Sequence, residues 1–227
     1  MSSSEVKKFA VFVAGGSGSR MKSALPKQFM ELAGKPVLMH TLQKFYDYDA
    51  AIDLILVLPE AQMDDWKILC SVHNFRIPHQ LVPGGATRFH SVKQGLSILQ
   101  EEGLVAIHDG VRPLVNAQTI ENVYTLAAQK GNAIPSIPLN DSIRKVSGAH
   151  NESVLRSDYR LIQTPQCFLV SAIKQAHQQE YKESFTDCAS VYEAHGGKIN
   201  LVEGNPENIK ITTPSDFIVA ESFVNKT

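Results

Sequence analysis

The sequence predicts an α/β fold: a Rossmann-like, mostly parallel sheet with helices on both faces, plus a protruding β-arm. Apolar runs of strand length alternate with amphipathic stretches of helix length, and glycine-rich turns follow several of the runs. A strand covered on both faces reads as a continuous apolar run, and parallel strands need a crossover helix between them. We expect residues 1–227 to form a single domain.

The apolar runs place the strands, and the amphipathic stretches place the helices. Strong strand signals fall at 9–14, 54–58, 104–108 and 133–137, with a weaker one at 80–82 and short late ones at 199–202 and 209–211. Helical patterns lie at 36–46, 61–70, 91–100 and 117–129, followed by 170–181, 186–195 and 214–223. This order predicts strand–helix alternation through most of the chain.

Residues 138–165 interrupt the alternation with a polar, turn-rich segment. It contains short β-like pieces such as 143–146 and 159–163, and the pieces that flank Ser-Gly-Ala-His at 147–150 predict a hairpin that stands off the main sheet. A two-stranded hairpin is only marginally stable alone. We therefore expect 138–165 to be a dimerisation arm that packs on a partner subunit; the alternative is a surface insertion without a partner.

Composition excludes several classes of function. A hydrophobic content of 43% supports a sizeable core, and a net charge of −1 argues against a nucleic-acid partner. The N-terminus has no apolar signal segment and no run approaches membrane-spanning length, so we expect a cytoplasmic protein without a membrane partner. Cys70, Cys167 and Cys188 form no CxxC pair, and the eight histidines show no paired metal spacing.

The most informative segment follows the first apolar run. Gly15, Gly16 and Gly18 allow backbone N–H groups to approach a phosphate, because no Cβ stands in the way. Arg20 and Lys27 come shortly after and can neutralise the phosphate charge. Ligands of such sheets bind at the carboxyl ends of the strands, so the segment predicts a nucleotide site. The alternative is an ordinary glycine-rich turn between a strand and a helix.

Two familiar glycine motifs are absent from this segment. The dinucleotide fingerprint requires a third glycine where the chain has Met21. A dehydrogenase is a further functional alternative, and the failed fingerprint weakens it. The Walker loop requires a second glycine before Lys-Ser/Thr, and the chain again has Met21, before Lys22 and Ser23. Pro26 disfavours a helix through this stretch.

Two further strand ends carry residues suited to phosphate and base binding. Asp109 could hold Mg²⁺ directly or through water, and its alternative role is that of a turn or capping residue. The Gly84-Gly85 turn could let a base lie against backbone, with the Ser91 hydroxyl reading a base edge. Lys210 could bind a second phosphate if it points inward, and is otherwise a solvated strand residue.

Structural roles are also open to His108 and to residues 186–188. His108 could face the site or be a structural histidine. Thr186 or Asp187 caps a helix, and Cys188 is rejected as a nucleophile because no histidine pairs with it.

Taken in order, these segments resemble the 2-C-methyl-D-erythritol 4-phosphate cytidylyltransferase family. The resembling residues are 14–21 (AGGSGSRM), 26–28 (PKQ), 84–92 (GGxxRxxSV), 108–113 (HDxxRP), 164–166 (TPQ), 186–190 (TDxAS) and 208–210 (NIK), where x marks positions outside the resemblance. The resemblance spans almost the whole chain. It implies the nucleotidyltransferase-type fold, a homodimer that forms through the arm, CTP as the nucleotide and Mg²⁺ as the cofactor.

The resemblance also implies roles for individual residues. The catalytic pair that stabilises the transition state at the α-phosphate would be Arg20 and Lys27. The nucleotide would be bound by Ala14, Gly15, Gly16, Gly18, Gly85, Ala86, Ser91 and Asp109, with Asp109 next to the metal. The methylerythritol phosphate would be positioned by Arg112, Ser142, Arg156, Thr164 and Lys210. The chain departs from the family pattern at Ala86, where some members have an acidic residue, at Gly110, where alanine is common, and at Ser142, where threonine is usual.

The implied reaction transfers CMP from CTP to 2-C-methyl-D-erythritol 4-phosphate. It requires positioning and fixed positive charge but no covalent nucleophile. One alternative is a cytidylyltransferase for another polyol phosphate such as ribitol 5-phosphate. A second, of another class, is a non-catalytic nucleotide-binding sensor, although a sensor has no need of the charges at Arg20 and Lys27 that stabilise a transition state.

Overall fold

The computed structural model describes residues 6–15 and 25–224. Three residues with predicted roles, Gly16, Gly18 and Arg20, lie outside this part of the chain, so their roles stay predictions.

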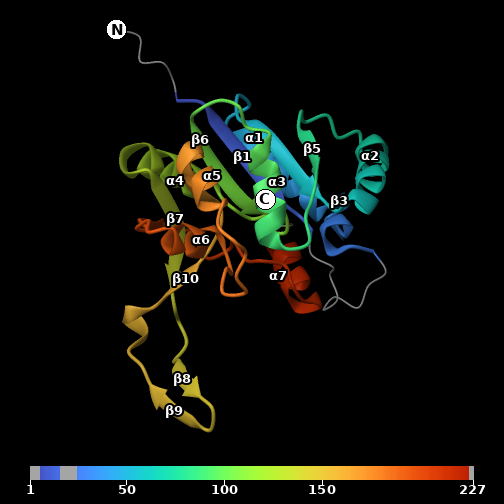
Figure 1. The fold of residues 1–227 in the computed structure, drawn as a ribbon. Helices are drawn as coiled ribbons and strands as arrows, with labels where there is room; N and C mark the ends of the chain where they lie inside the picture. Colours follow the sequence, from blue (N-terminus) through green and yellow to red (C-terminus); the bar gives the residue numbers. More distant parts are fainter. Residues whose placement is uncertain (1–5, 16–24, 225–227) are drawn as a thin grey trace.

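The described residues form one main sheet with the strand order β10-β7-β11-β6-β1-β4-β5, and β12 pairs with β7 (Figure 1). The central strands are β1 (Lys8–Val13), β4 (Asp53–Leu58), β5 (Gln80–Pro83) and β6 (Leu104–Asp109), and all their pairings with one another are parallel. The other side of the sheet holds β7 (Asn132–Pro138), β10 (Arg160–Ile162), β11 (Gln166–Leu169) and β12 (Leu201–Glu203). The sheet is mostly parallel and Rossmann-like, as predicted.

Helices cover both faces of this sheet (Figure 1). One face packs on α1 (Val37–Tyr48), α2 (Met63–Val72) and α4 (Ala117–Lys130), and the other on α3 (Arg88–Ser97), α5 (Val170–Ala176) and α6 (Cys188–Ala194). Strand β1 serves both cores, because Ala10 and Phe12 face the first and Val11 and Val13 face the second. No helix in the described residues is long and apolar enough to cross a membrane.

A third, smaller core is separate from these two. It joins α7 (Pro214–Val224) and the short strands β2 (Glu31–Leu32) and β3 (Lys35–Pro36) through residues such as Leu32, Val111 and Ala220. Short 3₁₀ turns lie at Lys27–Phe29, Glu60–Gln62 and Arg156–Asp158.

The structure corrects two of the expected elements and adds one strand. Residues 209–211 are not a strand; they form an extended loop in which the Ile211 N–H donates to the Val111 carbonyl. Strand β11 was not expected, and it lies antiparallel between β6 and β7. The helix expected over 170–181 ends at Ala176, the last residue of α5. Beyond this end, the Gln179 side chain donates one hydrogen bond to the Ala176 carbonyl and one to the Val191 carbonyl of α6.

The segment 138–165 contains a two-stranded hairpin. Strand β8 (Arg144–Ser147) pairs antiparallel with β9 (His150–Ser153), and Gly148 in the turn has a φ of +58°. Figure 1 shows this hairpin hanging away from the main sheet. The piece at 159–163 does not belong to the hairpin, because it forms β10 and pairs with β7. Val146 and Leu155 are exposed on this segment.

Candidate active site

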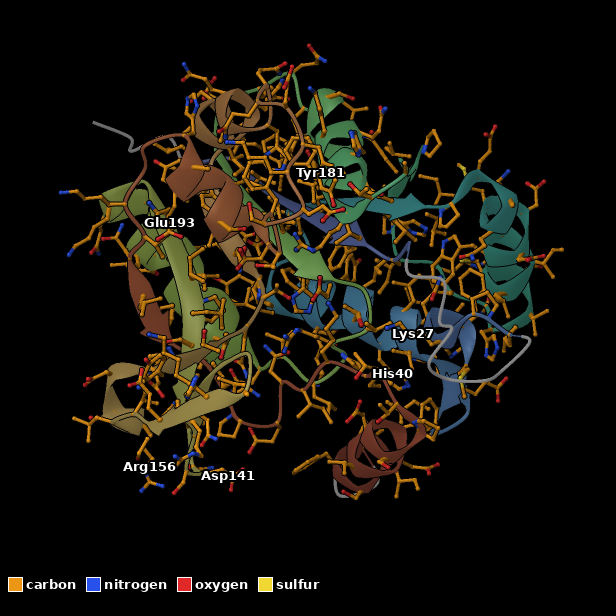
Figure 2. All side chains as sticks on the ribbon, turned by 60° about the horizontal axis from the view of Figure 1, so that its bottom comes forward. Lys27, His40, Asp141, Arg156, Tyr181 and Glu193 are labelled. Carbon is orange, nitrogen blue, oxygen red and sulfur yellow. The ribbon has the colours of Figure 1, made fainter. Side chains whose placement is uncertain are left out.

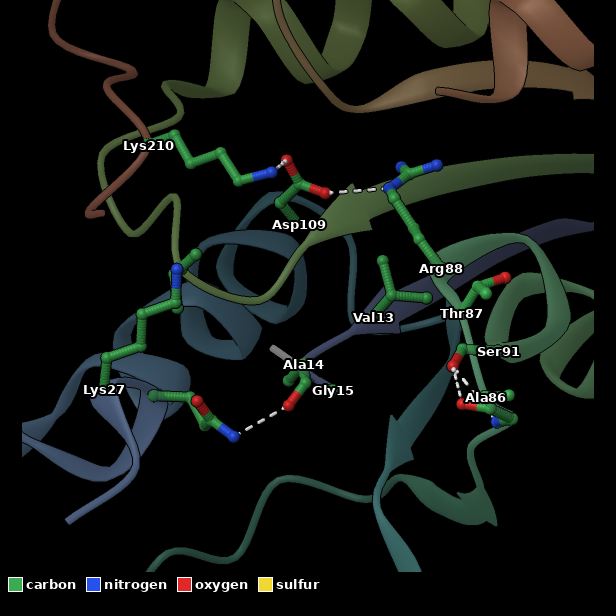
Figure 3. Close-up of a pocket in the computed structure, with 13 residues that line it drawn as sticks. Val13, Ala14, Gly15, Lys27, Ala86, Thr87, Arg88, Ser91, Asp109 and Lys210 are labelled. Carbon is green, nitrogen blue, oxygen red and sulfur yellow. Dashed lines mark hydrogen bonds and ion pairs between the residues drawn. The ribbon is translucent and has the colours of Figure 1, made fainter. Parts of the chain in front are cut away.

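A cavity of about 300 Å³ lies where β1 and β6 end and α3 begins (Figure 3). Its lining consists of Val13, Ala14, Gly15, Lys27, Gln28, Gly85, Ala86, Thr87, Arg88, Ser91, Asp109, Val111 and Lys210. A second hollow of about 230 Å³ shares Arg88, Asp109 and Lys210 with it. The rest of the second lining is Arg112, Ile162, Gln163, Thr164, Gln166, Thr186 and Asp187. The fold thus gathers residues from seven segments of the chain around these two hollows.

The end of β1 is fixed to the turn that carries Lys27. The Ala14 N–H donates to the Val57 carbonyl, and the Ala14 carbonyl accepts from Gln28 Nε2 at 2.8 Å. Gln28 is fully buried and its Nε2 also donates to Gln62 Oε1 at 2.7 Å. Lys27, next in the chain, is 8% exposed and its Nζ donates to the Ile211 carbonyl at 3.2 Å. The contact of Gln28 with Ala14 therefore fixes the turn that carries Lys27, and the Ile211 carbonyl binds the Lys27 ammonium group; sequence reasoning missed both contacts.

The second glycine turn is supported by the residue predicted to read a base. The Gly85 N–H donates to Ser91 Oγ at 3.1 Å, and Ser91 Oγ donates to the Gly85 carbonyl at 3.4 Å. A Cβ on Gly85 would collide with His90, so the turn requires glycine. Thr87 caps α3 by accepting from the His90 N–H. Ser91 holds the turn in this structure, and its contact with a base stays a prediction.

Asp109 lies at the centre of a cluster of three cations. Its Oδ1 lies 3.3 Å from Arg88 Nε, and its Oδ2 lies 2.9 Å from Lys210 Nζ and 3.5 Å from Arg112 Nε (Figure 3 draws the first two). Burial alone would raise the pKa of Asp109, but Arg88, Lys210 and Arg112 hold it well below its usual range. The carboxylate is therefore ionised, and three cations around one anion leave the cluster with excess positive charge suited to phosphates.

The nucleotide cavity offers the predicted Mg²⁺ one described carboxylate, that of Asp109. Among the described residues, no group of three or more His, Cys, Asp or Glu side chains could hold a metal ion. Proteins often bind Mg²⁺ through one or two carboxylates together with substrate phosphates and water. The ionised Asp109 fits a metal that arrives with a nucleotide, and does not fit a metal held by protein groups alone.

His108 is a structural residue and does not face the cavity. It is fully buried, its Nδ1 lies 2.9 Å from Thr164 Oγ1 and its Nε2 lies 3.1 Å from the Arg112 carbonyl. Burial lowers its pKa to about 4, so the ring is neutral near pH 7. Thr164 Oγ1 also accepts from the Asp109 N–H at 3.1 Å. Thr164 and His108 together fix the backbone from which Asp109 projects.

A network of buried amides places Lys210 without a strand. Arg112 Nη1 donates to the Asn208 carbonyl at 2.6 Å, and Asn208 Nδ2 donates to the Thr164 carbonyl at 2.8 Å. Gln163 Nε2 donates to the Asn205 carbonyl at 2.9 Å. Lys210 therefore points inward, although the expected strand that was to carry it is a loop.

Gln166 fixes the start of α6 against the sheet. Its Oε1 accepts from the N–H groups of Cys188 and Ala189, and its Nε2 donates to Asp187 Oδ2 at 2.7 Å. Asp187 is the helix cap, in a capping box with Ser190. Burial raises the pKa of the Cys188 thiol, which keeps it protonated and agrees with its rejection as a nucleophile.

Ser142 and Arg156 are not brought to the cavity of their own chain. Both are exposed, neither lines either hollow, and Arg156 Nη1 donates to the nearby Asn140 carbonyl. Figure 2 shows Arg156 and Asp141 at an end of the molecule that lies away from Lys27. Within one chain, the structure assembles Lys27, Asp109 and Lys210 but leaves these two residues apart.

Comparison with known proteins agrees with this architecture. The family model described as 2-C-methyl-D-erythritol 4-phosphate cytidylyltransferase matches residues 9–226. A protein of that name from Bacteroides thetaiotaomicron is 50% identical over 219 residues, which cover 96% of this chain and 100% of the relative.

Solved structures give the same result. That of 4-diphosphocytidyl-2C-methyl-D-erythritol synthase from Anaerococcus prevotii superposes with a TM-score of 0.83 at 27% identity, and covers 97% of this chain and 96% of that one. That of 2-C-methyl-D-erythritol 4-phosphate cytidylyltransferase from Thermus thermophilus has a TM-score of 0.77 at 29% identity, with 97% and 99% covered. The chain belongs to the 2-C-methyl-D-erythritol 4-phosphate cytidylyltransferase family.

Proposed function

We propose that this enzyme transfers CMP from CTP to 2-C-methyl-D-erythritol 4-phosphate, with release of pyrophosphate and formation of 4-diphosphocytidyl-2-C-methyl-D-erythritol. The observation that carries the proposal is the cation cluster around Asp109, which is shared by two adjoining hollows. Two anionic substrates have to meet in this reaction. The relatives that share nearly the full length of the chain carry the name of this activity.

In this reaction a phosphate oxygen of the polyol substrate attacks the α-phosphorus of CTP. A new P–O bond forms, the bond between the α-phosphorus and the bridging oxygen breaks, and pyrophosphate leaves with that electron pair. The protein contributes alignment and fixed positive charge. The cavity with Ala14, Gly15 and Gly85 would take the nucleotide, and Lys27 at its rim would stabilise charge that grows on the α-phosphate. Arg20 would act with Lys27.

The second hollow would take the polyol phosphate, with Arg112, Thr164 and Lys210 as its positioning residues. A divalent cation, for which we propose Mg²⁺, would be bound by the nucleotide phosphates together with Asp109. Its chemistry is to neutralise phosphate charge as the leaving group departs. Asp109 meanwhile keeps the three surrounding cations oriented toward the two hollows. We also propose that the enzyme acts in the cytoplasm.

We propose that a partner subunit completes each site. Ser142 and Arg156 lie on the segment that includes the hairpin and line neither hollow of their own chain, and the apolar side chains of Val146 and Leu155 on the same segment are exposed. In a two-fold dimer, the arm of one subunit would bring both residues to the second hollow of the other.

One assay tests the reaction. Pyrophosphate release is measured for each nucleoside triphosphate against a panel of polyol phosphates that includes ribitol 5-phosphate, and the product is identified by mass. We expect turnover with CTP and 2-C-methyl-D-erythritol 4-phosphate, and its loss in excess EDTA. Preferred turnover of ribitol 5-phosphate would reassign the substrate. Binding of CTP without turnover of any polyol phosphate would favour the nucleotide-binding sensor.

A further inference from the structure

Arg88 belongs to the cation cluster around Asp109 and lies where the two hollows meet. It is the first residue of α3, directly after the Thr87 cap, and it lines both hollows. Its side chain is 24% exposed, and this exposed surface faces the site. The helix cap and the glycine turn before it hold its backbone in place.

The charge of Arg88 is only partly compensated. Its Nε lies 3.3 Å from Asp109 Oδ1, but Asp109 is shared with Arg112 and Lys210. Its Nη1 donates to the Cys188 Sγ at 3.3 Å, and a thiol sulfur is a weak acceptor. Its Nη2 is buried and finds no hydrogen-bond partner among the residues that the structure describes. Because these contacts neutralise its charge only in part, the Arg88 guanidinium group contributes a positive electrostatic potential to both hollows.

We propose that Arg88 is a further anion-binding residue of this active site, whose fixed positive charge attracts the phosphates of both substrates at the junction of the two hollows. The proposal rests on the proposed function for the identity of the substrates. A guanidinium group is suited to this position because it remains charged at any working pH and is weakly hydrated, so burial beside Asp109 costs it less than an ammonium group.

The test compares a charged ligand with a neutral one. Binding of inorganic pyrophosphate and of cytidine is measured by calorimetry in EDTA for the wild type, Arg88→Met and Arg88→Lys. We expect Arg88→Met to weaken pyrophosphate binding about 10- to 100-fold and to leave cytidine binding unchanged. Arg88→Lys keeps the charge and should lose less than Arg88→Met. Lys93→Met, on the same helix but outside both hollows, is the matched control and should bind both ligands as the wild type does.

Asp109→Asn separates a direct effect of charge from an effect through Asp109. If Arg88 only held Asp109 in place, Asp109→Asn would weaken pyrophosphate binding as Arg88→Met does. The charge argument predicts the opposite sign, since loss of the carboxylate leaves Arg88, Arg112 and Lys210 uncompensated and should tighten pyrophosphate binding. Thermal unfolding of each variant confirms that it is folded.

Three results would overturn the proposal: wild-type pyrophosphate binding by Arg88→Met, equal losses of cytidine and pyrophosphate, or an Asp109→Asn variant that matches Arg88→Met. The proposed function has its own readout, which is product formation by the wild type. Absence of product with the expected binding pattern would remove the reaction and keep the anion site.

Discussion

Lys27 is the described residue with the clearest catalytic prediction. Its ammonium group is held at the rim of the nucleotide cavity by a largely buried side chain. Because removal of one preorganised charge contact at a transition state costs about 10²–10³ in kcat, we expect this loss in Lys27→Ala with a smaller change in KM for CTP. Steady-state kinetics checks the split, with Lys35→Ala outside both hollows as control. A normal kcat with a raised KM for CTP would assign Lys27 to ground-state binding, and Arg20→Ala should behave as Lys27→Ala does.

At the scale of single residues, the sequence predicted which residue types meet but not how they pair. Arg112, Thr164 and Lys210 were each expected at the substrate side, and the structure brings all three to the second hollow. Asp109 was expected at the nucleotide and the metal, and it lines both hollows. The ion pair of Asp109 with Arg88 was not expected. Contacts between side chains that lie far apart in the chain leave no periodic signal in a sequence. The role of His108 was left open for the same reason, since only its partners show that it is structural.

At the scale of elements, α3 depends on a glycine where it crosses the sheet. A Cβ on Gly95 would lie 2.7 Å from Val11 Cγ1 and 2.9 Å from Val57 Cγ2, so Gly95→Ala should push α3 away from β1 and β4. Alanine would favour the helix by about 1 kcal/mol, but overpacking a tight core costs about 1–3 kcal/mol. We expect net destabilisation in urea unfolding, while Ser97→Ala, on the exposed face of α3, should be neutral or stabilising. A more stable Gly95→Ala variant would show that the contact yields easily.

The free energy of unfolding should depend on pH through His177, which directly follows α5 and packs on Phe89 of α3. His177 is buried and stacks on Phe89, and its Nδ1–H donates to the Ile173 carbonyl while Nε2 has no partner among the described residues. Burial lowers its pKa to about 4, below the ordinary 6.5, so the unfolded chain binds a proton between these values and the folded one does not. The stability contributed by the neutral ring is full above pH 6.5 and falls as the pH drops toward 4, by about 3 kcal/mol.

Urea unfolding of the wild type and His177→Leu between pH 4 and 7 checks this. The free energy of unfolding should change less steeply with pH in the variant, by the amount that corresponds to the uptake of about one proton on unfolding. Equal slopes would show that His177 titrates alike in both states.

Strand β11 shows why some elements could not be predicted. It has four residues, and its first, Gln166, is polar yet fully buried because it binds the start of α6. A polar residue at this position interrupts the apolar pattern that predicts a buried strand, so the sequence favours a loop there. The opposite error occurred at 209–211, where Ile211 is buried in the third core and the apolar alternation resembles a strand. The long parallel strands were predicted because burial on both faces makes each of them apolar throughout.

At the scale of the whole molecule, mixed dimers test whether the arm acts across subunits. Arg156→Ala and Lys210→Ala should each give a nearly inactive homodimer. In a mixed dimer, one site carries both defects and the other carries neither, so refolding an equal mixture should recover about a quarter of wild-type activity. Two affinity tags confirm that subunits have exchanged. Exchange without recovery would show that the arm serves its own subunit.

The separation of Arg156 from the cavity of its own chain has a genetic consequence. If each arm completes the neighbouring site, a chain that carries both Arg156→Ala and Lys210→Ala damages both sites of every dimer that it enters. Such an allele, expressed beside the normal one, would be dominant negative, because only pairs of normal chains would stay fully active. At equal expression these pairs are about one in four dimers. A chain that carries either change alone would leave one site intact in each mixed dimer. Two alleles with one change each would therefore complement each other, whereas the allele with both changes would inactivate the mixed dimers.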